Sequence, residues 1–269
     1  MIVYPNCKIN LGLNVVARRS DGYHNLETVF YPIPLCDELS IEESETDSLS
    51  IAGLQLEGNI NDNLVMKALY LLREKGYSIP KIKIELKKNI PSGAGLGGGS
   101  SDAAFMMKAL NERFQLGMSE GMMEKHVSTL GADCAFFIQN KPVYAEGIGN
   151  EFHPIALNLQ GWHLVLVKPD DFVSTKEAYS LITPCKPTYN VTEIVQQPVE
   201  TWKELLTNDF EKSVFPNHTN ILKVKNKLYE MGATYSCMSG SGSSVFGLFK
   251  SPVALPEEFQ GMFTYQCKL

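Results

Sequence analysis

The sequence has 269 residues, with 24 Lys and Arg against 30 Asp and Glu, which gives a formal net charge of −6 at pH 7. The lack of a basic excess argues against a nucleic-acid-binding protein, because such proteins gain much of their affinity from cations that neutralise phosphates. The longest apolar runs have only a few residues, as at 164–167, whereas a membrane-spanning helix needs about 20. We therefore expect a globular protein with no nucleic-acid or membrane partner.

Cysteine and histidine usage indicates the compartment. The six cysteines are scattered without a C-x-x-C pair, and the five histidines lack the spacing of a zinc site. The first residues contain neither the charged nor the apolar section of a secretory signal. We therefore expect a reduced, cytoplasmic protein. The length suits two domains, and we place them at 1–155 and 156–269.

The N-terminal part of the chain is predicted to be mainly strands. Residues 9–15 alternate apolar and polar side chains, which is typical of a half-buried strand and places Lys8 and Asn10 on one face. A turn leads to a second strand at 23–31, which should end at the prolines of 32–34. Further short strands are expected at 39–41, 49–51, 54–56 and 82–86.

Helical spacing and caps predict the other elements. The first helix is expected at 64–75, with Asp62 or Asn63 as its N-cap and Gly76 as its stop signal. Further helices are expected at 103–114, 119–130, 174–181, 199–206 and 220–231. Later strands are expected at 143–146, 162–167, 233–238 and 245–249. Runs of strands and helices in this order predict an α+β fold.

A glycine-rich loop stands between the strand at 82–86 and the helix at 103–114. Five of the seven residues from Gly93 to Gly99 are glycine, and glycine is costly to order unless something must approach the backbone closely. The free N–H groups of a helix N-terminus form an anion site, to which serine hydroxyls add donors. We predict a triphosphate-binding loop made of Pro91, Ser92, Gly93, Ala94, Gly95, Leu96, Gly97, Gly98, Gly99, Ser100 and Ser101. The alternatives are a flexible connector and a tight contact between helix and sheet.

The loop does not match the common nucleotide motifs. Its G-x-G-x-x-G spacing is a weak dinucleotide signal, because it lies far along the chain and not in an opening βαβ unit. Ser100 follows the last glycine where a Walker A motif needs lysine. A second loop rich in small residues, 239–244, is expected either to close over substrate phosphates or to be a plain hairpin turn.

The segment 91–101 resembles the phosphate loop of the galactokinase, homoserine kinase, mevalonate kinase and phosphomevalonate kinase (GHMP) superfamily. The stretches 5–11 and 19–30 are similar to the branch that acts on 4-diphosphocytidyl-2-C-methyl-D-erythritol, and 131–133 and 238–246 match its later motifs. The resemblance implies a two-domain α+β kinase with its active site in the cleft between domains. It also implies ATP as co-substrate, with Mg²⁺ expected, and a small-molecule acceptor without an obligate protein partner.

Lys8 and Asp133 are the candidate catalytic residues. Taken singly, a strand lysine is usually solvated and an Asp after Gly-Ala usually makes a turn or cap. Beside a triphosphate loop, Asp133 would accept the proton of an alcohol, while Lys8 would keep Asp133 ionised and offset charge on the γ-phosphate. The resemblance implies the same two roles. The sequence assigns no magnesium ligands.

The resemblance assigns recognition of the cytidine end to Tyr23 and His24, with Tyr179 as a second stacking aromatic and Asn10 as a hydrogen-bonding residue. A pyrimidine offers a face for stacking and an edge that a histidine can read. Tyr179 at helical spacing fits a core position equally well. The acceptor would be phosphorylated on its 2-hydroxyl, in the non-mevalonate route to isoprenoid precursors. The alternatives are another alcohol, such as mevalonate or homoserine, and a nucleotide-binding regulator without turnover.

Overall fold

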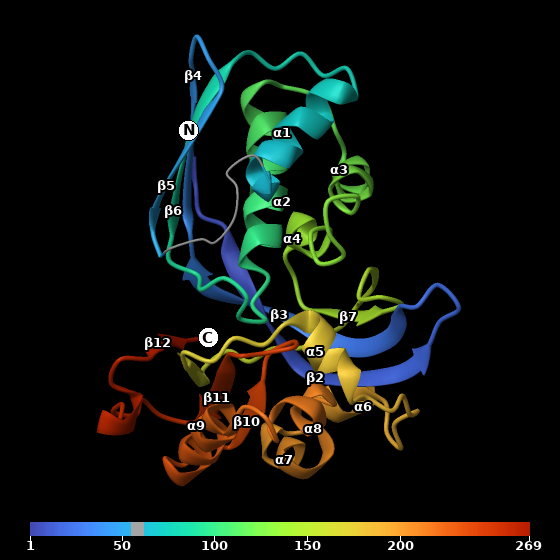
Figure 1. The fold of residues 1–269 in the computed structure, drawn as a ribbon, viewed down its shortest axis with the longest axis vertical. Coiled ribbons are helices and arrows are strands. Elements are labelled where there is room, and N and C mark those ends of the chain that lie inside the picture. The colour runs from blue at the N-terminus through green and yellow to red at the C-terminus, as the bar shows by residue number, and fades with distance from the viewer. Residues whose placement is uncertain (55–61) are drawn as a thin grey trace. The chain divides into compact units, whose positions relative to one another are not determined.

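The computed structural model describes residues 1–54 and 62–269, and the chain forms two compact units (Figure 1). Unit 1 is assembled from residues 1–8, 35–92 and 97–141, and unit 2 from residues 9–34, 93–96 and 142–269. Strands β2 (Asn6–Arg18) and β3 (His24–Cys36) contribute to both units. The predicted domain boundary at residue 155 stays a prediction.

Unit 1 is a sheet covered by helices. Its strands lie in the order β1-β4-β6-β5, and only β5 and β6 run parallel. The bounds are β1 (Ile2–Val3), β4 (Glu38–Glu43), β5 (Ser48–Gly53) and β6 (Ile82–Lys88). Alternate residues of β6 are buried, because one face of the sheet packs on the helices (Figure 1).

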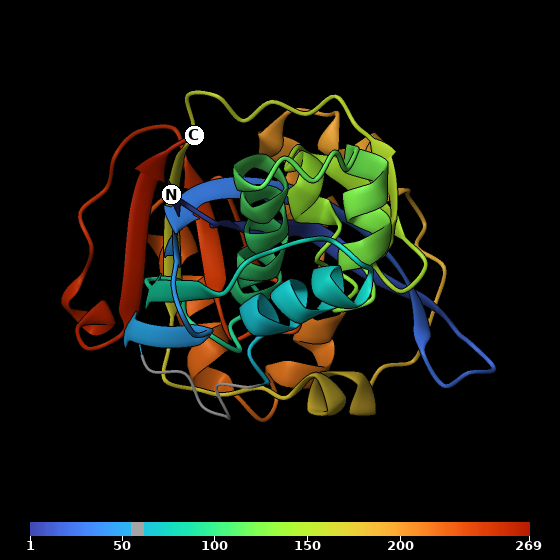
Figure 2. The same ribbon diagram turned by 90° about the horizontal axis from the view of Figure 1, so that it is seen from above.

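The helices of unit 1 pack around the longest of them. Their bounds are α1 (Leu64–Glu74), α2 (Gly98–Arg113), α3 (Glu120–Val127) and α4 (Phe136–Gln139). Helix α1 begins at its N-cap Asn63, whose side chain accepts from the Val65 N–H, and Gly76 follows it with φ +89°. Helix α2 contacts α1, α3 and α4 (Figure 2). Helix α2 is thus the central helix of unit 1.

Unit 2 contains two four-stranded sheets, ordered β2-β3-β7-β8 and β10-β11-β9-β12. The remaining strand bounds are β7 (Val143–Glu146), β8 (Glu151–Pro154), β9 (His163–Lys168), β10 (Tyr235–Met238), β11 (Val245–Phe249) and β12 (Phe263–Lys268). Both faces of β10 and β11 are buried, and neighbouring strands of the second sheet pair antiparallel.

The helices of unit 2 are mostly short. Their bounds are α5 (Thr175–Ser180), α6 (Val191–Val195), α7 (Trp202–Leu205), α8 (Phe210–Val214) and α9 (Thr219–Glu230), with 3-10 turns at Val199–Thr201 and Glu257–Phe259. The core of the unit includes Val165, Phe210 and Leu228, from β9, α8 and α9. This packing anchors α5, which contacts α8.

Two predictions about the first strands were wrong. Residues 6–13 of β2 are buried on both faces, so the strand is not half-buried. Strand β3 continues through Pro32 and Pro34 to Cys36. Strand β3 pairs with β7 only at 28–30, so the prolines interrupt no ladder to β7. The strand expected at 54–56 extends outside the described residues.

Candidate active site

Lys8 and Asp133 form an ion pair in unit 1. Lys8 lies on β2 and is 3% exposed, and its Nζ is 3.5 Å from Oδ2 of Asp133, in the turn before α4. The Asp133 side chain is 33% exposed. Burial lowers the pKa of Lys8, and the charge of Asp133 acts in the opposite direction. Lys8 is therefore not a solvated strand residue but a buried cation directed at a carboxylate that solvent reaches.

The end of the glycine-rich loop forms the start of α2. Gly97 is the N-cap, with φ +71°, and no side chain caps the helix. The Ser101 N–H donates to the Gly97 carbonyl at 2.9 Å, so the N–H groups of residues 98–100 precede the helical hydrogen-bond ladder. Among residues 1–54 and 62–269, a Cβ on Gly99 would meet only Leu64, at 3.9 Å. The first turn of α2 thus presents backbone N–H groups with open space over Gly99.

Residues 93–96 pack within unit 2 against the second small-residue loop. Ser239 Oγ donates to the Gly95 carbonyl at 2.9 Å, and the Ser244 N–H donates to the Ala94 carbonyl at 3.3 Å. A Cβ on Gly95 would lie 1.9 Å from the Ser239 carbonyl oxygen, so only glycine fits there. The loop 239–244 connects β10 and β11, and its hydrogen bonds to Ala94 and Gly95 hold the glycine-rich segment within unit 2.

Asn10 is buried at the same place in unit 2. It is 2% exposed, its backbone N–H donates to Ser239 Oγ at 3.2 Å, and its side-chain Nδ2 donates to Thr28 Oγ1 at 3.0 Å. The predicted substrate-binding residue is therefore tied to β3 and to the hairpin connection. Its amide group is fixed in orientation before any ligand arrives.

Two of the candidate acceptor residues, His24 and Tyr179, are in ring contact. The rings of His24 and Tyr179 are stacked, with centroids 4.7 Å apart and planes at 19°. Tyr179 also meets Phe210 edge-on and packs against the core of unit 2, whereas Tyr23 is 62% exposed. Burial, together with the charge of Arg18, lowers the pKa of His24, which favours the neutral ring. Tyr23 thus presents an open aromatic face beside a neutral histidine.

Sequence reasoning missed two features near the loop. Phe172 is 68% exposed, and its Cε2 lies 3.0 Å from the position of a Cβ on Gly93. Lys88 is 2% exposed and continues the buried series Ile82, Ile84 and Leu86 at every second position, which was a readable signal. Phe172 thus contacts the loop near its start, at Gly93. Lys88 precedes the loop in the sequence and contacts it near its end, at Gly98.

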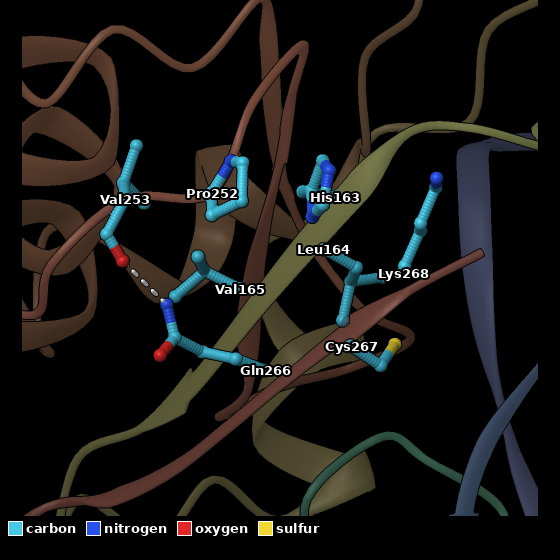
Figure 3. A pocket seen from close by; sticks show the side chains of 8 residues that line it. All are labelled: His163, Leu164, Val165, Pro252, Val253, Gln266, Cys267 and Lys268. Atoms are coloured by element: carbon cyan, nitrogen blue, oxygen red, sulfur yellow. Dashed lines mark hydrogen bonds between the residues drawn. The ribbon is translucent and has the colours of Figure 1, made fainter.

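Other candidate sites carry no predicted residue. A cavity of about 250 Å³ is lined by residues of β9, β12 and the loop at 252–253 (Figure 3). Within residues 1–54 and 62–269, no three His, Cys, Asp or Glu side chains gather to hold a metal, and no helix is long and apolar enough to cross a membrane.

Family models match both parts of the chain. The GHMP kinases N terminal domain matches residues 63–141, and the GHMP kinases C terminal model matches residues 191–263. The chain belongs to the GHMP kinase family. The predicted α+β kinase fold and the enzyme class are confirmed, since this family consists of ATP-dependent kinases.

Curated relatives point to one branch of the GHMP kinases. The 4-diphosphocytidyl-2-C-methyl-D-erythritol kinase of Bacteroides thetaiotaomicron is 57% identical over 261 residues, covering 96% of this chain and 95% of the relative. The enzyme of the same name from Bacteroides fragilis is 54% identical and covers both chains fully. The predicted resemblance to this branch is confirmed.

Solved structures agree with this placement. A crystal structure of 4-(cytidine 5'-diphospho)-2C-methyl-D-erythritol kinase superposes with a TM-score of 0.82 at 33% identity, over 94% of this chain and 91% of the other. Mevalonate kinase of Methanococcus jannaschii gives a TM-score of 0.73 at 14% identity, over 100% and 98% of the two chains. The second likeness shows the shared fold alone.

Proposed function

We propose that this GHMP kinase transfers the γ-phosphoryl group of ATP to the 2-hydroxyl of 4-diphosphocytidyl-2-C-methyl-D-erythritol, in the non-mevalonate route to isoprenoid precursors. The 57% identity to a kinase of that name over nearly the whole chain carries the choice of acceptor. None of the six cysteines forms a disulfide in the described part of the chain, which supports a reaction in the reducing cytoplasm.

In the proposed step, Asp133 accepts the hydroxyl proton as the acceptor oxygen forms a bond to the γ-phosphorus. The bond between that phosphorus and the β–γ bridging oxygen breaks, and ADP leaves. Lys8, 3.5 Å from Asp133, positions the acceptor oxygen and offsets charge on the transferring group. Because Lys8 is buried, its ammonium acts in a medium where charge interactions are stronger than in water.

The nucleotide is assigned to the loop 91–101, whose helix N-terminus suits an anion. The donor chemistry of the loop also fits a magnesium ion bound together with ATP, since Ser100 is a partly exposed oxygen donor. Magnesium would neutralise charge on the phosphates. The cytosine is assigned to Tyr23 for stacking and to His24 for its edge, while Tyr179 holds His24 and Asn10 orients the acceptor.

The test is an ATP-consumption assay of the purified chain without acceptor and with 4-diphosphocytidyl-2-C-methyl-D-erythritol, mevalonate or homoserine. We expect turnover with the first acceptor alone. Turnover with mevalonate or homoserine would indicate another alcohol kinase, and ATP binding without turnover would indicate a regulator.

A variant assay tests the assignment of the base. We expect D133N to lower kcat by about 100-fold or more while ATP affinity changes little, because Asp133 acts on the hydroxyl and not on the nucleotide. E120Q, which neutralises an exposed carboxylate of the same unit, is the control. Wild-type turnover in D133N would remove Asp133 as the base.

A further inference from the structure

Three charged side chains are buried together in unit 1. Lys88 at the end of β6, Asp37 between β3 and β4, and Asp102 on α2 are 2%, 0% and 2% exposed. The Lys88 Nζ donates to Asp102 Oδ2 at 2.6 Å and also to Asp37 Oδ2. We call these three residues the Lys88 cluster.

The Lys88 cluster connects the two ends of the proposed phosphate loop. Asp37 Oδ1 accepts the backbone N–H groups of Asn89 at 2.6 Å and Ile90 at 2.8 Å, immediately before the loop. Asp102 directly follows Ser101, the last residue of the loop. The Lys88 Nζ lies 3.6 Å from the position of a Cβ on Gly98, the first residue of α2. The ammonium group is therefore beneath the first turn of α2.

Stability does not explain this arrangement well. Taking charges out of water costs several kcal/mol per ion, and apolar replacements of buried ion pairs are often neutral or stabilising. Burial raises the pKa of the Asp102 carboxyl to about 7, with the charge of Lys88 acting in the opposite direction. Among the described residues, Oδ1 of Asp102 has no hydrogen-bond partner although it is buried. Burying the Asp102 carboxyl thus costs free energy, which is typical of groups whose role is to fix the position of other groups.

We infer that Lys88, Asp37 and Asp102 are positioning residues for the nucleotide: they fix the N-terminal turn of α2 to the end of β6 so that its backbone N–H groups stand ready for the phosphates. This inference rests on the proposed ATP-dependent function. A hydrogen-bonding cradle binds well only when it is already ordered, because ordering it on binding subtracts from affinity. Asp102 is the member of the cluster that holds α2.

A positioning role predicts how the loss of affinity depends on the number of phosphates in the ligand. Loss of the connection should weaken ligands in proportion to the contacts that they make with the turn, so a nucleoside triphosphate is affected and adenosine is not. If the cluster acted on the nucleotide through its net charge alone, the change in phosphate affinity would have the opposite sign. The Lys88 cluster holds two carboxylates and one ammonium, so removing one carboxylate would strengthen phosphate binding.

The experiment compares D102A with D102N by calorimetric titration, using a non-hydrolysable ATP analogue, ADP and adenosine as probes. Alanine removes the connection to Lys88 and leaves the Lys88–Asp37 pair intact. Asparagine keeps an oxygen that accepts from Lys88 Nζ and is the matched control. We expect D102A to weaken the ATP analogue and ADP by about tenfold, with adenosine and the acceptor KM unchanged and D102N close to wild type.

Three results would overturn the positioning role. These are equal weakening of adenosine and the ATP analogue in D102A, unchanged affinity for all three probes, and tighter binding of the analogue in both variants. If D102A does not fold, D102S replaces it, because serine keeps a small polar side chain at this buried position of α2 and is too short to reach Lys88. Failure of the wild-type chain to bind the ATP analogue would instead contradict the proposed function itself.

Discussion

Replacing Lys8 by methionine separates the catalytic contribution of its charge from its contribution to packing. Methionine has a similar length and no charge, so K8M keeps the buried volume beside Gly97, where Lys8 Cε lies 3.4 Å from the position of a Cβ. We expect kcat to fall by about 100-fold or more, because the charge that offsets the transferring phosphoryl group is lost.

The same change should leave stability equal or higher. Burial lowers the pKa of Lys8, so the fold disfavours the charged form that K8M removes. The partner carboxylate of Asp133 is 33% exposed and stays hydrated when it loses its cation. We therefore expect K8M to be more stable than wild type at pH 7 by about 0–2 kcal/mol, at the lower end of what replacing a buried ion yields.

The pH dependence of this difference has a defined sign. Below its folded pKa, Lys8 is charged in both states and the burial cost is fully present. Between the folded pKa and the ordinary value of 10.5, the unfolded chain binds more protons, so wild-type stability rises with pH. The advantage of K8M should therefore be largest near neutral pH and shrink as the pH approaches 10.5.

The assays are ATP consumption with the cytidine-bearing acceptor, and denaturant unfolding at neutral and alkaline pH. K108M is the matched control, since Lys108 is another partly buried lysine of unit 1, whose Nζ donates to the Ile138 carbonyl at 3.1 Å. We expect its kcat to stay within about twofold of wild type. If K8M kept a kcat within tenfold of wild type, or unfolded more easily at pH 7, Lys8 would be a structural residue.

Three further changes test other parts of the molecule. G99A should fold normally, because within the described part of the chain a Cβ there meets only Leu64, at 3.9 Å, but it should weaken ATP binding in a calorimetric titration. A loss no greater than in the exposed-helix control G121A would mean that the loop is a connector. Y23A should raise the acceptor KM by the equivalent of about 1–3 kcal/mol with ATP affinity unchanged, and equal loss with methylerythritol phosphate, which lacks the cytidine, would make Tyr23 a packing residue. D47N should lose about 1–3 kcal/mol of unfolding free energy at pH 7, because Arg73 holds the pKa of Asp47 well below its usual range. This contribution is complete above the ordinary Asp pKa of 3.8 and is lost as the pH falls through the folded value, so a D47N deficit that persisted in strong acid would contradict it.

The elements predicted correctly from sequence carry their own local signals. Helix α1 has an N-cap at Asn63 and a stop at Gly76, and both act as expected. Helices α6 and α8 were missed because each has five residues, which is little more than one turn and too short to show a period. Strand β3 was ended too early because local reasoning treats a proline as a break, whereas what matters is whether a neighbouring strand needs its N–H.

The candidate site divides in the same way. The glycine-rich loop is contiguous, so its composition is enough to identify it. The need for glycine at position 95, however, comes from the carbonyl of Ser239, which is 144 residues away in sequence. The stacking of His24 on Tyr179 likewise joins residues that no sequence pattern relates. Residue types and local spacing were readable, whereas the partners that fix their orientation depend on tertiary contacts.

The two buried lysines show where sequence reasoning could have gone further. Lys88 occupies the next inward position of β6 after Leu86, so the alternation places an ammonium in the core. A buried ammonium requires a carboxylate, and this requirement alone predicts an ion cluster at the end of the strand. The local sequence does not show which carboxylates pair with Lys88, since Asp37 and Asp102 lie 51 and 14 residues away. A lysine at an inward position of a strand is therefore a stronger signal of a built site than a lysine at an outward position, because a buried charge must be compensated by a specific partner.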